Sequence, residues 1–315
     1  MILAGDIGGT NTRLALFGAE LGAPAAIDVY RSRDHAGLEV MVQDFLSHHP
    51  GEVTSATFAV AGPVRGGHAE MTNLAWPVEA ARIAEAVGIP HVSLLNDLHA
   101  NARGIEALGL DDFATVNEGE AGATGNAAVV SAGTGLGQAG LYWDGERHHA
   151  FAAEGGHTDF APRNELEDGL RQFLAADYQH VSYERVCSGI GLVNIHRYLA
   201  GPDPEALDGV EITRRALDGS DPVCVQAIDL LVSIYGAQAG NVALTLMATG
   251  GVYLGGGIAP VILVKLREGG FMEAFKDKGR LAELLDRIPV RVILNEQTAL
   301  LGAALDAAER ARSLA

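Results

Sequence analysis

Apolar residues follow two patterns along this chain. Short apolar runs are typical of buried β-strands, whereas apolar residues recurring every three or four positions are typical of helices that cover a core. The expected strands cover residues 1–5, 12–17, 57–62, 91–95, 126–130, 138–143, 250–254 and 290–294. The expected helices cover residues 77–87, 97–108, 165–178, 222–247 and 298–313. Pro77 should lie near the first turn of its helix, and Thr298 should be the N-cap of the last helix. Because strands alternate with helices, the expected fold class is α/β.

One long stretch, residues 230–264, carries no charged residue. A membrane span needs about 20 predominantly apolar residues in succession, but Gln238, Asn241 and the glycine run 255–257 interrupt this stretch. It is better explained as a buried helix, a buried strand, and a glycine turn that leads into another helix. The N-terminus lacks a basic region and Asp6 interrupts its apolar run, so we expect neither a targeting segment nor a membrane partner.

Two glycine-rich turns connect expected strands and share one plan. Gly9-Thr10 and Gly133-Thr134 occupy equivalent places 124 residues apart. This repetition predicts a duplicated α/β unit, each copy of which presents a hairpin turn to a shared cleft. A chance resemblance between two glycine hairpins is the alternative. A GxGxxG pattern begins at Gly135, but a strand rather than a helix follows it, which argues against a dinucleotide site.

The composition of these turns suits phosphate. Glycine allows the backbone to approach a ligand closely, successive N–H groups form an anion-binding nest, and Thr10 and Thr134 add hydroxyl donors. Asp6, beside the first turn, is suited to hold hydrated Mg²⁺, with a turn-forming role as the alternative. A third glycine cluster, "GGVYLGGGIAP" at residues 250–260, offers a flat backbone to a base or ribose. Its alternative is a tight strand-to-helix turn.

Charge and cysteine content exclude several classes of protein. The chain has 315 residues, enough for two domains or one large one, and a net charge of −18. Nucleic acids and anionic membranes require basic patches, so we expect neither as a partner. Cys187 and Cys224 are the only cysteines and form no CxxC pair. We therefore expect neither a disulfide framework nor a cysteine zinc site, and we expect a reducing, cytoplasmic setting.

Taken together, the three glycine turns resemble those of the superfamily of sugar kinases, Hsp70 and actin. Within it, the chain resembles the bacterial glucokinase family over essentially its whole length. The segments that carry the resemblance are, in the family's order, "GDIGGTNTRLAL", "AVAGPV", "MTNLAW", "LLNDLHANARGI", "SAGTGLGQAGL", "EGGHTDFAP", "YERVCSGIGLVNIHRYL" and "GGVYLGGGIAP". The resemblance implies two domains of duplicated ribonuclease-H-like (actin/hexokinase-type) α/β fold with a cleft between them. It places the small domain at residues 1–107 plus 298–315 and the large domain at 108–297, and it implies a homodimer.

The resemblance also assigns ligands to residues. It implies that the hexose is held by Asn73, Asn96, Asp97, Glu154, His157 and Glu184, with the loop of Gly62 and Pro63 nearby. It implies that ATP is contacted by the second phosphate turn and the adenosine turn, with Gly133, Thr134, Gly135, Gly256 and Gly257. From the composition of the first turn we expect further nucleotide contacts at Gly5, Asp6, Ile7, Gly8, Gly9, Thr10 and Asn11, with Mg²⁺ held by Asp6 through water. In the neighbouring ROK kinases and repressors a zinc-binding cysteine cluster follows the Gly-His pair. Here "TDFAPRNELEDG" follows His157, so the resemblance implies no zinc and a direct contact between His157 and the sugar.

The chemistry of these residues fits a hexose. Carboxylates and amides are natural partners of sugar hydroxyls, and Asn96 and Asp97 directly follow an expected strand, where α/β sheets bind ligands. Asp97 would accept the proton of the 6-hydroxyl as this group attacks the γ-phosphorus. The alternatives are a helix N-cap for Asp97 and a turn residue for Asn96.

The other candidates also have simpler explanations. Glu154 could be a solvated loop carboxylate, and His157 a structural histidine. Glu184, expected early in a helix, could serve only the helix dipole. Arg13 could neutralise phosphate or lie on the strand face, and the sequence leaves this open.

The implied activity is ATP-dependent phosphorylation of glucose to glucose 6-phosphate and ADP. One alternative is a related kinase that prefers mannose, fructose or an N-acetyl sugar. Another is a non-catalytic sugar-sensing repressor, which would need a DNA-binding helix pair, and only four residues precede Gly5. A third is a chaperone-like or filament ATPase, which would lack the Asn-Asp pair and the Glu-x-x-His pattern.

Overall fold

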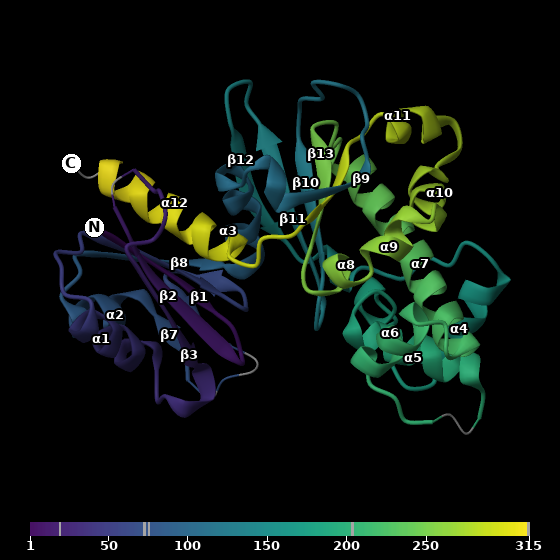
Figure 1. Cartoon of the computed structure of the whole chain (residues 1–315), viewed down its shortest axis with the longest axis horizontal. Coiled ribbons are helices and arrows are strands. Elements are labelled where there is room, and N and C mark those ends of the chain that lie inside the picture. The colour runs from purple at the N-terminus through teal and green to yellow at the C-terminus, as the bar shows by residue number, and fades with distance from the viewer. Residues whose placement is uncertain (19, 72–73, 75, 203–204, 314–315) are drawn as a thin grey trace. The chain divides into compact units, whose positions relative to one another are not determined.

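The computed structural model describes residues 1–18, 20–71, 74, 76–202 and 205–313. The chain divides into two compact units (Figure 1). The first contains residues 1–109, 149–152 and 295–315, and the second contains residues 110–148 and 153–294.

The first sheet has five strands in the order β3-β2-β1-β4-β8. These are β1 (Ile2–Ile7), β2 (Asn11–Phe17), β3 (Ala26–Arg31), β4 (Ser55–Val60) and β8 (His91–Asn96). β2 pairs antiparallel with β1 and β3, whereas β1, β4 and β8 are parallel. A small separate sheet contains β5 (Val64–Arg65), β6 (His68–Ala69) and β7 (Val78–Glu79).

Alternation along β1 divides the first unit into two cores. Leu3 and Ile7 pack with α1 (Leu38–His48) and α2 (Ala80–Val87) on one side of the sheet. Ile2 and Ala4 pack with α3 (Asp97–Gly104) and α12 (Thr298–Ser313) on the other side. Successive side chains of a strand point to opposite faces, so one apolar run supplies both cores.

The second sheet repeats the topology of the first. Its order is β12-β11-β10-β13-β14-β9, with β10 antiparallel to β11 and parallel to β13. The strands are β9 (Phe113–Asn117), β10 (Ala127–Ala132), β11 (Leu136–Trp143), β12 (His148–Ala153), β13 (Gly251–Gly255) and β14 (Val290–Ile293). The strand order and the pairing directions of β10, β11, β13 and β14 match the first sheet, with β9 added antiparallel at one edge. The predicted duplication is therefore confirmed.

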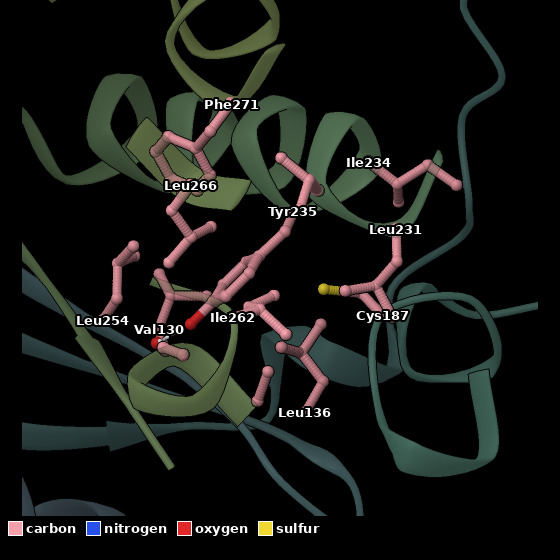
Figure 2. Close-up of a cluster of buried hydrophobic side chains, with 14 of the residues drawn as sticks. Val130, Leu136, Cys187, Leu231, Ile234, Tyr235, Leu254, Ile262, Leu266 and Phe271 are labelled. Carbon is pink, nitrogen blue, oxygen red and sulfur yellow. Dashed lines mark hydrogen bonds between the residues drawn. The ribbon is translucent and has the colours of Figure 1, made fainter. Parts of the chain in front are cut away.

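One long helix, α7 (Pro222–Leu246), forms the centre of the second core. Figure 2 shows Tyr235 of this helix among buried apolar side chains, with its hydroxyl donating to the Val130 carbonyl of β10 at 2.8 Å. The helix is long and apolar enough to cross a membrane, but 72% of its most apolar stretch is buried inside the protein. The buried helix expected in the uncharged stretch is thus confirmed.

Further helices surround α7. They are α4 (Glu165–Ala175), α5 (Gly189–Ala200), α6 (Gly209–Leu217), α8 (Ile258–Val261), α9 (Leu263–Arg267), α10 (Gly270–Lys276) and α11 (Ala282–Asp286). Among them, α5, α6 and α10 pack directly on α7.

Two expected helix starts were wrong. Pro77 does not begin a helix, because β7 occupies the next two residues and α2 begins only at Ala80. Thr298 is the first residue of α12 rather than its N-cap, and its buried hydroxyl donates to the Asn295 carbonyl at 2.6 Å. The Thr298 backbone packs closely on Gly104. A Cβ on Gly104 would lie 1.9 Å from the Thr298 carbonyl oxygen. Tertiary packing therefore fixes the start of α12.

Candidate active site

Three candidate segments of the first unit follow strands that end in register. Ile7 of β1 lies beside Val60 of β4, and Val60 lies beside Asn96 of β8. The first glycine turn, the loop of Gly62 and the Asn96-Asp97 pair therefore leave the same edge of the sheet. The expected position of Asn96 and Asp97 at the carboxyl end of a strand is confirmed, and this is the edge where α/β sheets bind ligands.

The first glycine turn is closed by hydrogen bonds. The Gly8 N–H donates to the Asn11 carbonyl at 3.0 Å, and the Gly8 carbonyl accepts from the Ser32 hydroxyl at 2.7 Å. The Ser32 N–H also donates to the Thr10 carbonyl at 3.0 Å. Ser32 is fully buried and follows the edge strand β3, so the sequence pattern gave no signal for it.

The nucleotide candidates around this turn differ in exposure. Thr10 and Asn11 are exposed, and Gly9 is half-buried. Gly5 and Ile7 lie inside β1, and the Ile7 side chain belongs to the core. A Cβ at Gly5 would lie 2.4 Å from Phe58 Cδ1, so glycine there permits close packing within the sheet.

Asp6 and Arg13 face each other across β1 and β2. Arg13 Nη1 lies 3.5 Å from Asp6 Oδ2, and Arg13 Nη2 lies 3.3 Å from Glu296 Oε2. Burial raises the pKa of Asp6 above its usual value, and the Arg13 guanidinium opposes this rise. The Asp6 side chain stays 20% exposed beside the turn, so its hard oxygen donors fit a hydrated Mg²⁺. Arg13, which the sequence left open, pairs with acidic side chains.

Asn96, rather than Asp97, caps the helix that follows β8. Asn96 Oδ1 accepts the N–H groups of Leu98 at 3.0 Å and His99 at 3.2 Å, and its Nδ2 donates to the Gly62 carbonyl at 3.1 Å. Asp97 is the first residue of α3, and its Oδ1 accepts from the Leu98 N–H at 2.9 Å. The alternative of an N-cap for Asp97 was therefore wrong, because its neighbour holds that position. Asn96 is accordingly more than a turn residue.

In the second unit, the other two glycine turns are neighbours. Ser131 of β10 lies in register with Gly255 of β13, so the turns that follow these strands start side by side. Gly256 has a φ of +78°, and a Cβ on it would lie 2.3 Å from the Ala132 carbonyl oxygen. Gly257 is exposed at the start of α8. The expected strand-to-helix turn is present, and it contacts the second candidate phosphate turn.

The start of α5 also contacts the second candidate phosphate turn. The Gly133 N–H donates to the Gly135 carbonyl at 2.9 Å, and the Gly133 carbonyl accepts from the Gly189 N–H at 2.8 Å. Ser188 caps α5 by accepting the Gly191 N–H at 3.0 Å. Helix N-termini favour anions. This helix start was not predicted from the sequence, although a serine such as Ser188 directly before an apolar run is typical of a helix N-cap.

Three hexose candidates come together in the second unit. His157 Nε2 lies 3.9 Å from Glu154 Oε2, and His157 Nδ1 lies 4.0 Å from Glu184 Oε1. Glu184 Oε2 accepts the Leu136 N–H at 3.1 Å, and a Cβ at Gly135 would lie 2.4 Å from the same oxygen. The carboxylate of Glu184 therefore lies directly against the second candidate phosphate turn.

The local structure and exposure of Glu154, His157 and Glu184 bear on the simpler roles considered for them. Glu184 lies in the first turn of a short 3₁₀ helix, Tyr183–Arg185, and the longer helix α5 begins only at Gly189. The Glu154 and His157 side chains are 72% and 61% exposed, so His157 is not a buried structural histidine. Asn73 lies outside the described residues.

One group of potential metal ligands lies elsewhere in the second unit. His196, Asp221 and Cys224 place one ligand atom each within 4.8 Å of one another, a grouping that sequence spacing did not indicate. Asp221 Oδ1 already accepts the N–H groups of Val223 and Cys224 as the N-cap of α7. Its Oδ2 lies 3.8 Å from Arg215 Nη1. The expected absence of zinc stays a prediction.

Comparison with known proteins identifies the family. A sequence model of the glucokinase family matches residues 3–310. The chain belongs to the glucokinase family. It is 41% identical to a glucokinase from Nostoc sp., covering 98% of this chain and 99% of that protein. It is 39% identical to a glucokinase from Pectobacterium atrosepticum, covering 96% and 95% of the two chains. The resemblance inferred from the sequence is confirmed.

Solved structures of glucokinases share the fold. The crystal structure of a glucokinase from an Antarctic psychrotroph matches with a TM-score of 0.88 and 30% identity, over 98% of both chains. A ROK family glucokinase from Streptomyces griseus, solved with glucose and AMPPNP, matches with a TM-score of 0.67 over 98% of this chain and 99% of that one. At 22% identity the second match shows the fold alone. The predicted two-domain α/β fold of the actin/hexokinase type is confirmed.

Proposed function

We propose that this protein transfers the γ-phosphoryl group of ATP to the 6-hydroxyl of glucose, giving glucose 6-phosphate and ADP. The observation that carries the proposal is the position of Glu184. Its carboxylate approaches His157 on one side and accepts the Leu136 N–H at the end of the second glycine turn on the other. Glu184 thus joins the candidate hexose residues to the second candidate phosphate turn, which supports phosphoryl transfer to a sugar. Relatives at 39–41% identity are named glucokinases.

The catalytic work in this proposal is positioning and proton transfer. Glu154, His157 and Glu184 orient the hexose, and the turn N–H groups hold the phosphates. Asp97 accepts the proton of the 6-hydroxyl as the oxygen attacks phosphorus. Because Asn96 caps α3, the Asp97 carboxylate is not needed for that purpose. Bound Mg²⁺ would neutralise phosphate charge, with Asp6 as its ligand through water.

We further propose ATP as the donor, because Gly256 and Gly257 lead from β13 into α8 directly beside the second candidate phosphate turn. The net charge of −18 disfavours nucleic acid and anionic membrane as partners. A zinc-free homodimer in a reducing, cytoplasmic setting completes the proposal.

A coupled ADP-release assay tests the proposal. The protein is given ATP and Mg²⁺ with glucose, mannose, fructose, N-acetylglucosamine or no sugar. We expect the highest kcat/KM with glucose and little ADP without sugar. A higher kcat/KM for another sugar would favour the related hexose kinase. Glucose binding without ADP release would favour a non-catalytic sensor.

A further inference from the structure

The turn that carries Glu154 and His157 is seated on β11 through two glycines. A Cβ at Gly155 would lie 2.0 Å from Gln138 Oε1, and a Cβ at Gly156 would lie 1.8 Å from the Leu136 carbonyl oxygen. Gly155 and Gly156 therefore lie too close to β11 to carry a side chain unless neighbouring atoms move. The inner end of the turn is fixed by β11, while its polar side chains remain largely exposed.

At Gly155 the close neighbour is one side chain. The three atoms nearest to a Cβ there all belong to the Gln138 carboxamide, at 2.0, 2.9 and 3.6 Å. Gly155 does not have a positive φ, so Gln138 is the reason for glycine at this place. The sequence could not show this, because the two residues are 17 positions apart and meet only in the folded unit.

Gln138 has an unusual hydrogen-bonding state. Its side chain is 5% exposed, and its Nε2 is buried with no hydrogen-bond partner among the described residues. A buried donor without an acceptor destabilises the state in which it occurs. Gln238, by contrast, is 4% exposed in the same unit, and its Oε1 accepts from Asn241 Nδ2 at 3.2 Å.

The hexose candidates above Gln138 are loosely arranged. The two N–O distances from His157 to Glu154 and Glu184, 3.9 and 4.0 Å, are longer than hydrogen bonds, so a polyol between these groups can draw them together. If that movement gives the Gln138 Nε2–H an acceptor in the turn, the bond is made only in the sugar-bound state. An interaction that differs between two states shifts the equilibrium towards the state in which it is stronger.

We infer that Gln138 is a positioning residue for the hexose: it supports the Glu154–His157 turn and donates its Nε2–H to an oxygen of that turn when the sugar is bound. The inference rests on the proposed function. Gln138 touches no sugar and acts through Gly155. It contributes to hexose affinity and not to the phosphoryl-transfer step.

Gln138→Met tests this inference, because methionine keeps the approximate shape and removes the donor. We expect the KM for glucose to rise about tenfold, with kcat within about twofold of wild type. The melting temperature without sugar should not fall, since the buried unpaired donor is gone, and the glucose-induced rise in melting temperature should shrink. Gln238→Met is the matched control. It should lower the melting temperature and leave the KM for glucose unchanged.

A wild-type KM for glucose in Gln138→Met would overturn the inference, whatever the melting temperature. Should that variant fail to fold, Gly155→Ala gives a second test. It should raise the KM through crowding against Gln138, and Gln138→Ala should remove this added effect in the double variant. An unchanged KM in Gly155→Ala would also overturn the inference. If the wild-type protein neither binds nor phosphorylates glucose, the proposed function fails instead.

Discussion

At the scale of single residues, the roles of the neighbours Asn96 and Asp97 differ. The sequence located the pair at a strand end, but Asn and Asp rank alike as helix caps, so it could not say which one caps α3. The structure places both cap hydrogen bonds on Asn96 Oδ1. Capping by Asn96 and proton acceptance by Asp97 are therefore separable by mutation.

Asp97→Asn should lower kcat strongly and change the stability little. The amide keeps the side-chain shape but cannot accept the 6-hydroxyl proton, so kcat should fall about 10²–10⁴-fold, with a smaller change in the KM for glucose. Because the Asn96 cap is retained, the melting temperature should stay near that of wild type. The control, Asn96→Ala, removes the cap and should cost about 1 kcal/mol of unfolding free energy. A folded Asp97→Asn protein with near-normal kcat would refute the role of base.

At the scale of elements, strands with an apolar run were predictable, including the edge strand β8, whereas the more exposed edge strands β3 and β12 were not. Runs such as β4, in which every residue is buried, give a plain apolar signal. β3 alternates half-buried and exposed residues, so polar positions interrupt its pattern and it was missed. β12 is mostly exposed and was missed for the same reason. The turns at the site were found because glycine clusters mark them, whereas the contacts between turns depend on strand register.

The contact between the two turns of the second unit gives a prediction at this scale. Gly256→Ala places a Cβ 2.3 Å from the Ala132 carbonyl oxygen at a φ of +78°, so the turns must separate. We expect a loss of about 1–3 kcal/mol in unfolding free energy and a clearly higher KM for ATP. Denaturant unfolding and initial rates at varied ATP measure the two effects.

The stability control for this variant is the next residue. Gly257 has a φ of −74°, and nothing lies within 4 Å of a Cβ placed on it. Gly257→Ala should therefore unfold at nearly the wild-type denaturant concentration. If both alanine variants were equally stable, the close approach of the turns would not be what requires glycine at 256.

At the scale of the whole molecule, the sequence revealed the duplication through its two glycine hairpins, and the matching strand orders confirm it. It could not reveal groups assembled from distant segments. Gln138 beneath Gly155, Ser32 beneath the first turn, and His196 beside Cys224 each join residues whose proximity depends on packing. Family resemblance supplies the candidate ligand-binding residues, whereas the residues that pack beneath them become visible only in the folded units.

The last of these groups leads to a prediction about metal content. Zinc at His196, Asp221 and Cys224 would have to displace the thiol proton of Cys224, and burial, with the Asp221 carboxylate beside it, raises the pKa of that thiol to about 11. Asp221 would also have to give up its helix cap or compete with Arg215. We therefore expect activity to survive a zinc-selective chelator when Mg²⁺ is in excess, and elemental analysis to find less than stoichiometric zinc. Cys224→Ala should keep wild-type kcat and KM. Stoichiometric zinc that is lost together with activity, and lost also in Cys224→Ala, would show that the three side chains hold a metal the enzyme needs.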